Sequence, residues 1–148
     1  MPVLMQQVTT EVFQSHPVWA EDLQKIYTEA NEARRCLDEQ VLEAGDFVTQ
    51  ALERPQHWFA AALFNEHLIG AVLVEAQPDL WLLRHLCVRE VTRRRGVASR
   101  LMALVAAEGQ AQSVRLIVPA QGLTLADQVL VERLGYRINT QTGDFELS

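Results

Sequence analysis

Six of the chain's 13 basic residues fall between positions 84 and 100, although the 148-residue chain carries a net charge of −6. Three consecutive arginines at residues 93–95 precede Gly96 and Ala98, between an apolar run and an amphipathic one. Adjacent guanidinium groups repel one another unless an anion lies between them. The first N–H groups of a helix attract phosphate, and small residues let the phosphate approach closely. The pattern therefore predicts a phosphate-binding turn over residues 88–99.

Apolar spacing predicts the elements that hold this turn. Strands are expected at 3–8, 57–64, 68–75, 80–88, 114–118, 136–138 and 145–147, and helices at 19–30, 32–54, 96–107 and 123–134. The second helical stretch is expected to break at Gly45, with Asp46 capping its continuation, and Gly109 is expected just past the end of the third. Residues 65–67 are expected to turn a hairpin. The order of elements predicts an α/β fold with a mixed sheet.

Composition narrows the class of protein. A chain of this length fits a single domain spanning residues 1–148. The acidic total disfavours a nucleic-acid partner. No apolar run is long enough to cross a membrane and the first residues lack a signal-peptide pattern, so a cytoplasmic location is expected. Cys36 and Cys87 form neither a disulfide framework nor a metal-type pair, so no metal site is expected.

The Arg-Arg-Arg-Gly-Val-Ala run at residues 93–98 resembles the Arg/Gln-x-x-Gly-x-Gly/Ala signature of the GNAT superfamily of N-acetyltransferases. Leu-Gly-Tyr at residues 134–136 resembles the end of that family's late helix. The resemblance implies a GNAT fold: a mixed central sheet with a splayed parallel strand pair that binds acyl-coenzyme A (acyl-CoA), and flanking helices. It also implies acetyl-CoA as ligand or donor. The main chain of Leu86, Cys87 and Val88 would hold the pantetheine arm and thioester, and the pyrophosphate would lie against Thr92, Arg93, Arg94, Arg95, Gly96, Val97, Ala98 and Ser99.

Within that superfamily, residues 88–97, 22–26 and 64–66 resemble the PanZ (PanM) family of acetyl-CoA sensors. These sensors bind the zymogen of aspartate α-decarboxylase and promote its self-cleavage, which links pantothenate synthesis to acetyl-CoA supply. The resemblance implies partner-binding positions at Asn65, Arg93 and Arg94. Asparagine also suits a tight turn, so Asn65 has a purely local explanation as well. The chain departs from that family in a longer region over residues 29–57 and at Leu63, where an arginine is expected, and both departures bear on the partner surface.

The positions expected to transfer protons carry apolar residues. In many GNAT enzymes the general acid is a tyrosine three residues before the Leu-Gly pair, which is Val131 here, and the base is a glutamate early in the central strand, where Leu82 and Leu83 stand. His85 and Cys87 are weaker candidates, because a lone histidine or cysteine in a strand is more often a packing residue. No catalytic residue is therefore assigned. Two functions stay open: an acetyl-CoA-dependent regulator of the decarboxylase zymogen, and an N-acetyltransferase acting on an amine of a small molecule or protein.

Overall fold

The structure is a computed structural model that describes residues 2–93 and 95–147. Its elements are β1 (Leu4–Val8), α1 (Thr10–Ser15), α2 (Pro17–Thr28), η1 (Glu32–Arg35), β2 (Cys36–Leu37), β3 (Gln40–Val41), α3 (Ala44–Glu53), β4 (His57–Phe64), β5 (His67–Ala76), β6 (Leu80–Val88), η2 (Glu90–Thr92), α4 (Val97–Ala111), β7 (Arg115–Val118), α5 (Leu125–Arg133), β8 (Arg137–Ile138) and β9 (Phe145–Leu147). Among these described residues, no helix is both long and apolar enough to cross a bilayer.

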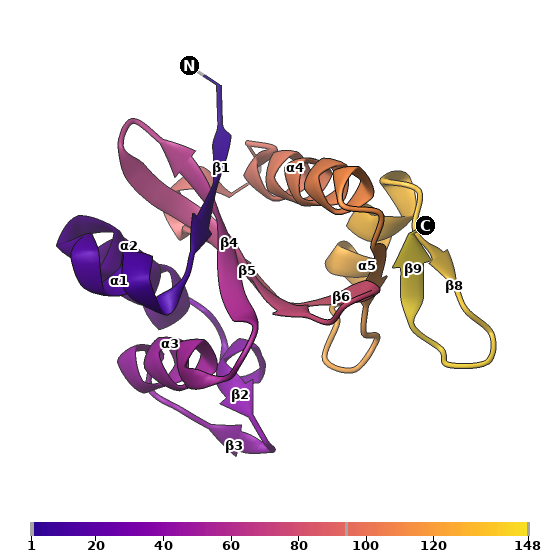
Figure 1. The fold of residues 1–148 in the computed structure, drawn as a ribbon, viewed down its shortest axis with the longest axis horizontal. Helices are drawn as coiled ribbons and strands as arrows, with labels where there is room; N and C mark the ends of the chain where they lie inside the picture. Colours follow the sequence, from indigo (N-terminus) through magenta and orange to yellow (C-terminus); the bar gives the residue numbers. More distant parts are fainter. Residues whose placement is uncertain (1, 94, 148) are drawn as a thin grey trace.

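Seven strands form one sheet in the order β1-β4-β5-β6-β7-β9-β8. The neighbouring strands are antiparallel except for β6 and β7, which run parallel. The strands β2 and β3 form a separate small hairpin. Helices α2 and α3 lie on one side of β4 and β5, and α4 lies on the other (Figure 1). The predicted α/β class with a mixed sheet is confirmed.

Alternating side chains of the central strands build two apolar cores, as expected where both faces of a sheet are covered. Trp58 and Ala60 of β4 pack with Leu101 of α4. Phe59 of β4 packs on the opposite face with Phe47 of α3 and other residues of the second core. Each core thus fixes one set of helices against the sheet, and β6 lies between both sets.

The region 32–54 differs from the single broken helix that its composition suggested. It forms the short 3-10 helix η1, the β2–β3 hairpin and then α3, and Gly45 lies within α3 rather than at a break. The helix begins after Glu43, so Asp46 lies in its first turn and does not cap it. The hairpin turns at Asp38 and Glu39, whose φ angles of 52° and 66° belong to the left-handed region. Glutamate adopts that conformation seldom, so the residue type at position 39 gave little sign of the turn.

The position of Gly109 also differs from expectation. The helix α4 continues through it to Ala111, and a Cβ on Gly109 would lie 2.7 Å from Cδ2 of Leu116 in β7. Glycine therefore serves close packing of α4 against β7 rather than termination of the helix.

The hairpin between β4 and β5 agrees with prediction. Asn65 and Glu66 form its two-residue turn, with φ angles of 49° and 66°, which suit the right-handed twist of the paired strands. The buried carboxylate of Asp22 in α2 accepts hydrogen bonds from the Leu68 N–H and from Nδ1 of His67, both at 3.0 Å. Because an unpaired N–H in this buried position would be costly, these bonds fix the hairpin to α2.

Candidate ligand site

The central strand β6 parts from β7 and so opens the sheet. Their parallel pairing joins Leu80 to Arg115, Trp81 to Leu116 and Leu82 to Ile117. Within the described residues, β6 then continues to Val88 with no strand partner on that side. The second half of β6 therefore presents a free edge to the space between the two strands.

Two hollows lie along this free edge. The outer chamber, of about 360 Å³, is lined by residues that include Glu29, Ala30, Val88, Arg93 and Thr124. The inner chamber, of about 460 Å³, is lined by residues that include Val72, Leu83, His85, Met102 and Val131. Arg34, Leu86 and Asp127 line both chambers. The two chambers therefore adjoin at these three residues and form one divided cleft.

A bulge in β6 shapes the inner chamber. The register between β5 and β6 shifts between Ala71 and Leu73, and opposite the shift His85 has a φ angle of 60°. The Tyr27 hydroxyl of α2 donates a hydrogen bond of 2.6 Å to the His85 carbonyl oxygen. Tyr27 is fully buried, so this bond holds the bulge from the opposite core.

The main chain beyond the bulge alternates between the two edges of β6. The Arg89 N–H donates to the Ile69 carbonyl oxygen of β5 at 2.8 Å, so by alternation Leu86 and Val88 direct their main-chain groups away from β5 and toward the cleft. Both of these carbonyl oxygens accept hydrogen bonds from arginines: Leu86 from Nη1 of Arg34, and Val88 from Nε of Arg93 at 3.1 Å. These two carbonyl oxygens are the acceptors that the free edge of β6 presents to the cleft.

An anion cradle follows β6 and η2, at the start of α4. Gly96 precedes α4 with φ 77° and ψ 12°, and an added Cβ there would meet no atom within 4 Å. Within the described residues, α4 has no side-chain cap at its N-terminus and no acidic residue in its first turn. Its first N–H groups are therefore free for an outside acceptor, and the helix dipole favours a negative one. Space, donors and local charge at this turn all suit a phosphate.

Glu29, just after α2, holds the arginine-rich turn. Its carboxylate accepts hydrogen bonds from Nε of Arg89 at 2.8 Å and from the Glu90 N–H at 2.7 Å. The Glu29 carbonyl oxygen accepts a weaker bond from Nη2 of Arg93 at 3.4 Å. Burial raises the pKa of the Glu29 carboxyl, but the bonds from Glu90 and Arg89 and the charges of Arg89 and Arg93 outweigh it and lower that pKa below its ordinary value. The turn is therefore anchored to α2 by a carboxylate in its charged form.

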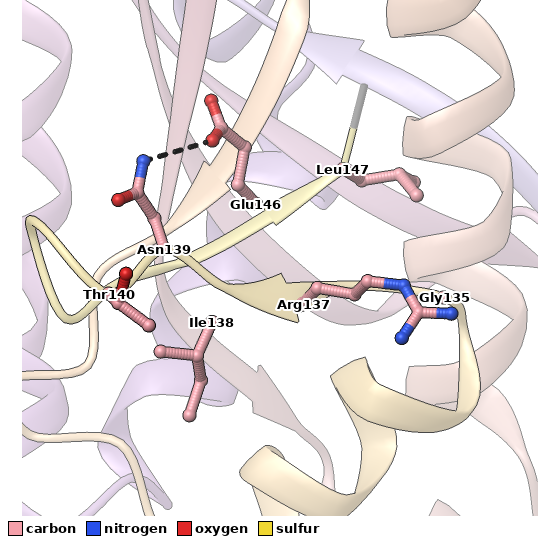
Figure 2. A pocket seen from close by; sticks show the side chains of 7 residues that line it. All are labelled: Gly135, Arg137, Ile138, Asn139, Thr140, Glu146 and Leu147. Atoms are coloured by element: carbon pink, nitrogen blue, oxygen red, sulfur yellow. Dashed lines mark hydrogen bonds between the residues drawn. The ribbon is translucent and has the colours of Figure 1, made fainter.

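A separate hollow of about 460 Å³ lies beside β8 and β9, at the end of the sheet that β8 forms (Figure 2). The side chains of Arg137, Ile138 and Thr140 line it, and Nδ2 of Asn139 donates to Oε2 of Glu146 at 3.4 Å. None of its lining residues belongs to the site predicted from the sequence, and in the strand order β7 lies between β6 and the strands β9 and β8 that line this hollow.

The family model described as "Acetyltransferase (GNAT) domain, PanZ" matches residues 6–128. The chain belongs to this family. The match includes the arginine-rich turn and most of the cleft, and the structure has the splayed parallel pair expected of a GNAT fold. The comparison with curated proteins gives no match.

Solved structures agree with the GNAT assignment. The putative N-acetyltransferase YhhK from E. coli, solved by NMR with coenzyme A bound, is 29% identical, with 99% of this chain and 98% of that chain covered and a TM-score of 0.60. Tetrahymena Gcn5 is 14% identical, with 97% and 94% covered and a TM-score of 0.71. A GNAT family acetyltransferase from Elizabethkingia anophelis, solved with acetyl-CoA bound, is 14% identical, with 93% and 77% covered and a TM-score of 0.64.

The residues predicted to bind the ligand lie along one continuous path in this GNAT domain. Leu86, Cys87, Val88 and Val97 are buried, Thr92 and Ala98 are half-buried, and Arg93, Arg95, Gly96 and Ser99 are exposed. Arg94 lies outside the described residues. The path runs from the free edge of β6 through η2 to the first turn of α4. Cys87 is the exception within it, because it pairs with Ala71 in β5 and its thiol lies 3.5 Å from the Ile26 carbonyl oxygen.

In the structure, the residues at the GNAT positions expected to transfer protons are apolar side chains that are buried or half-buried. Val131 is 1% exposed and belongs to the core, and Leu83 is buried beside the half-buried Leu82. His85 lines the inner chamber, where burial, reinforced by the charge of Arg84, lowers the pKa of its imidazole to about 4. The imidazole is therefore neutral at pH 7 and only weakly basic. Burial also raises the pKa of the Cys87 thiol, so this cysteine is not an activated nucleophile.

Three residues of the cleft were not singled out from the sequence: Glu29, Arg34 and Asp127. Each acts on a partner far away in the chain, 60 residues for Glu29 with Arg89 and 93 residues for Arg34 with Asp127. The available sequence signal is slight, since charged residues near helix ends are common on any surface.

Proposed function

We propose that this protein binds acetyl-CoA in the cleft beside β6 and, in that state, regulates cleavage of the aspartate 1-decarboxylase zymogen in the cytoplasm. The observation that carries the ligand assignment is the continuity of two sites, the free edge of β6 and the open anion cradle at Gly96. A coenzyme A molecule has amides and a pyrophosphate in that same order along its length. The match of this chain to a PanZ model supports the choice of partner.

The anion cradle suits the pyrophosphate. The uncapped N–H groups at the start of α4 and the exposed guanidinium of Arg95 supply donors of the kind that phosphate oxygens accept. Arg93 reaches the Val88 carbonyl oxygen from the same turn, so the cradle and the strand edge lie next to one another. A pantetheine arm that leaves the pyrophosphate would therefore meet the main chain of Val88 and Leu86 directly.

The absence of proton-transfer groups at the usual positions supports regulation over catalysis. An amine with a pKa near 10.4 is almost wholly protonated at pH 7, so acetyl transfer gains about 10²–10⁴-fold from a base and again from an acid. Val131 supplies no hydroxyl for the leaving thiolate, and Leu82 and Leu83 supply no carboxylate for the amine. Binding of acetyl-CoA without turnover is what a sensor requires.

A partner surface is available at the tip of the β4–β5 hairpin. Leu63, Asn65 and Glu66 border an apolar hollow of about 650 Å³, which Trp19 and Val18 also line. Val18 is 53% exposed, and Nε1 of Trp19 donates to the Glu66 carbonyl oxygen at 3.2 Å. A fixed turn beside exposed apolar side chains suits a protein partner. Leu63 makes this surface more apolar than the arginine expected at its position in the family.

Titration calorimetry with acetyl-CoA tests the ligand assignment. The wild-type protein is expected to bind, and the double variant Arg95→Glu, Gly96→Asp is expected to lose binding while it keeps the wild-type circular dichroism spectrum. Undiminished affinity in a folded double variant would refute the site. For the regulatory role, the purified protein is expected to accelerate cleavage of the same organism's decarboxylase zymogen with acetyl-CoA present and not without it. No complex and no acceleration would refute that role.

An N-acetyltransferase is the second candidate. The observation that favours it is the inner chamber itself, because its 460 Å³ beside the bulge leaves room for an acceptor amine near the neutral imidazole of His85. Release of free thiol from acetyl-CoA with a panel of amines distinguishes the two functions. Steady release that depends on a particular amine would establish an enzyme.

A further inference from the structure

Arg34 connects three elements across the middle of the cleft. It lies in η1, and its Nη1 donates to the Leu86 carbonyl oxygen of β6 while its Nη2 donates to Oδ2 of Asp127 at 2.7 Å, in the first turn of α5. The two charged side chains are 19% and 15% exposed. Water therefore screens this ion pair less than it screens a pair on the open surface.

The ion pair lies where the outer and inner chambers adjoin, since Arg34, Leu86 and Asp127 line both. The pyrophosphate cradle lies at the outer side, near Arg93, and the bulge at His85 lies at the inner side. A pantetheine arm bound to the cradle must pass this point before its thioester reaches the bulge. It must also compete with Arg34 for the Leu86 carbonyl oxygen.

We propose that the Arg34–Asp127 pair is a strap across the boundary between the two chambers, and that acetyl-CoA displaces Arg34 from Leu86 when it binds. This inference rests on the proposed function, because it concerns the same cleft and ligand. When Arg34 leaves Leu86, η1 and the β2–β3 hairpin that follows it lose a contact with β6, so ligand binding in the cleft changes the contacts of this segment. A segment that changes its contacts with the sheet on ligand binding gives a regulator a surface that differs between its two states.

Affinity for two ligands tests the strap. Arg34→Ala removes the competitor for Leu86, so the affinity for acetyl-CoA is expected to rise by about three- to tenfold, the net value of one hydrogen bond that the ligand no longer has to break. Asp127→Asn weakens the same pair without emptying the cleft, and a smaller rise is expected. Adenosine 3′,5′-bisphosphate lacks the pantetheine arm, so its affinity is expected to be the same in wild type and both variants.

The matched control is Arg115→Ala, because Arg115 also forms an ion pair with a carboxylate, that of Glu146 at 2.6 Å, and lines neither chamber. Its affinity for both ligands is expected to equal that of the wild type. If Arg34→Ala and Asp127→Asn bind acetyl-CoA as the wild type does, or more weakly, the strap is refuted while the ligand site stands. If the wild type itself does not bind acetyl-CoA, both the proposed function and the strap are refuted.

Hydrogen exchange supplies a readout that does not depend on affinity. On addition of acetyl-CoA, amides of residues 86–99 are expected to become more protected, and amides of residues 32–37 are expected to become less protected as Arg34 leaves Leu86. In Arg34→Ala the second segment is expected to exchange faster without ligand and to change little with it. Increased protection of residues 32–37 on binding would show that Arg34 closes onto the ligand, which overturns the strap.

Discussion

The carboxylate of Glu29 accepts a hydrogen bond from Nε of Arg89 at 2.8 Å and so joins the end of α2 to the turn that forms the anion cradle. Glu29→Gln keeps the shape of the side chain and removes its charge. We expect a loss of about 1 kcal/mol in the free energy of unfolding at pH 7, together with weaker acetyl-CoA binding, because the turn is less well held. Urea unfolding and calorimetry measure the two effects. Glu53→Gln, at an exposed glutamate at the end of α3, is the control and should change neither.

The effect of Glu29 should depend on pH in a defined direction. Because the pKa of Glu29 is lowered in the folded protein, its charged form stabilises the fold above the pKa of the unfolded chain, and this stabilisation is lost as the pH falls through the lowered pKa. The difference in unfolding free energy between wild type and Glu29→Gln should therefore shrink in acid. A difference that stayed constant down to pH 2 would contradict the assignment of the charged form.

Gly96 and Gly143 form a matched pair for testing the anion cradle. Both have left-handed backbones, with φ angles of 77° and 81°, and both have open space where a Cβ would stand. Alanine at either position should therefore cost about 1 kcal/mol of stability, from backbone strain. Only Gly96→Ala should reduce acetyl-CoA affinity, by about tenfold, because its methyl group occupies the space of a phosphate. Equal affinities in the two variants would exclude Gly96 from the site.

A substitution at Asn65 can distinguish its role in the hairpin turn from a role in contacting the partner protein. Asn65→Gly keeps the left-handed conformation that the hairpin needs, with φ 49° in the wild type, and removes the amide side chain. We expect unchanged thermal stability and unchanged acetyl-CoA binding, with loss of the accelerated zymogen cleavage. Cleavage at the wild-type rate would mean that Asn65 serves only the turn.

His85 should make the protein sensitive to acid. Its pKa is lowered from 6.5 to about 4 by burial and by Arg84, so the unfolded chain binds a proton there that the folded protein does not. Stability from this group is complete above pH 6.5 and is lost as the pH falls toward 4, by about 2–3 kcal/mol. His85→Asn tolerates the left-handed backbone and should flatten this part of the stability profile. Urea unfolding at pH 7, 5.5 and 4 measures the difference, and parallel profiles for the two proteins would refute it.

The elements with strong local signals were predicted well. The turn at Asn65 and Glu66 and the strand that ends at Val88 follow from neighbouring residue types, and both are observed. The phosphate turn could be proposed from the sequence because donors, glycine and helix start lie within a few residues, and phosphate binding there stays a prediction. Local residue types were sufficient to predict the hairpin turn and the end of the strand.

The elements that depend on distant contacts were not predicted. The β2–β3 turn at Asp38 and Glu39 places the glutamate in a conformation that this residue type rarely adopts. Gly109 resembles a helix end in sequence, but its role is to let Leu116 of β7 approach. Arg34 became a cleft residue only when folding brought Leu86 and Asp127 to it, from 52 and 93 positions away. The spacing of residues along the sequence does not indicate contacts between residues this far apart.

The short pairing of β6 with β7 also has a consequence for how the native protein opens. Within the described residues, three register pairs join β7, and through it β9 and β8, to the larger part of the sheet. Although Leu116 also packs in the core shared with α4, elements joined to a sheet by few main-chain hydrogen bonds tend to open at a lower free energy than its central strands. Residues 115–147 should then open while β4 and β5 remain folded. A molecule that bridged the cleft would merge the two units, so the protein would gain cooperativity as well as stability when it is filled.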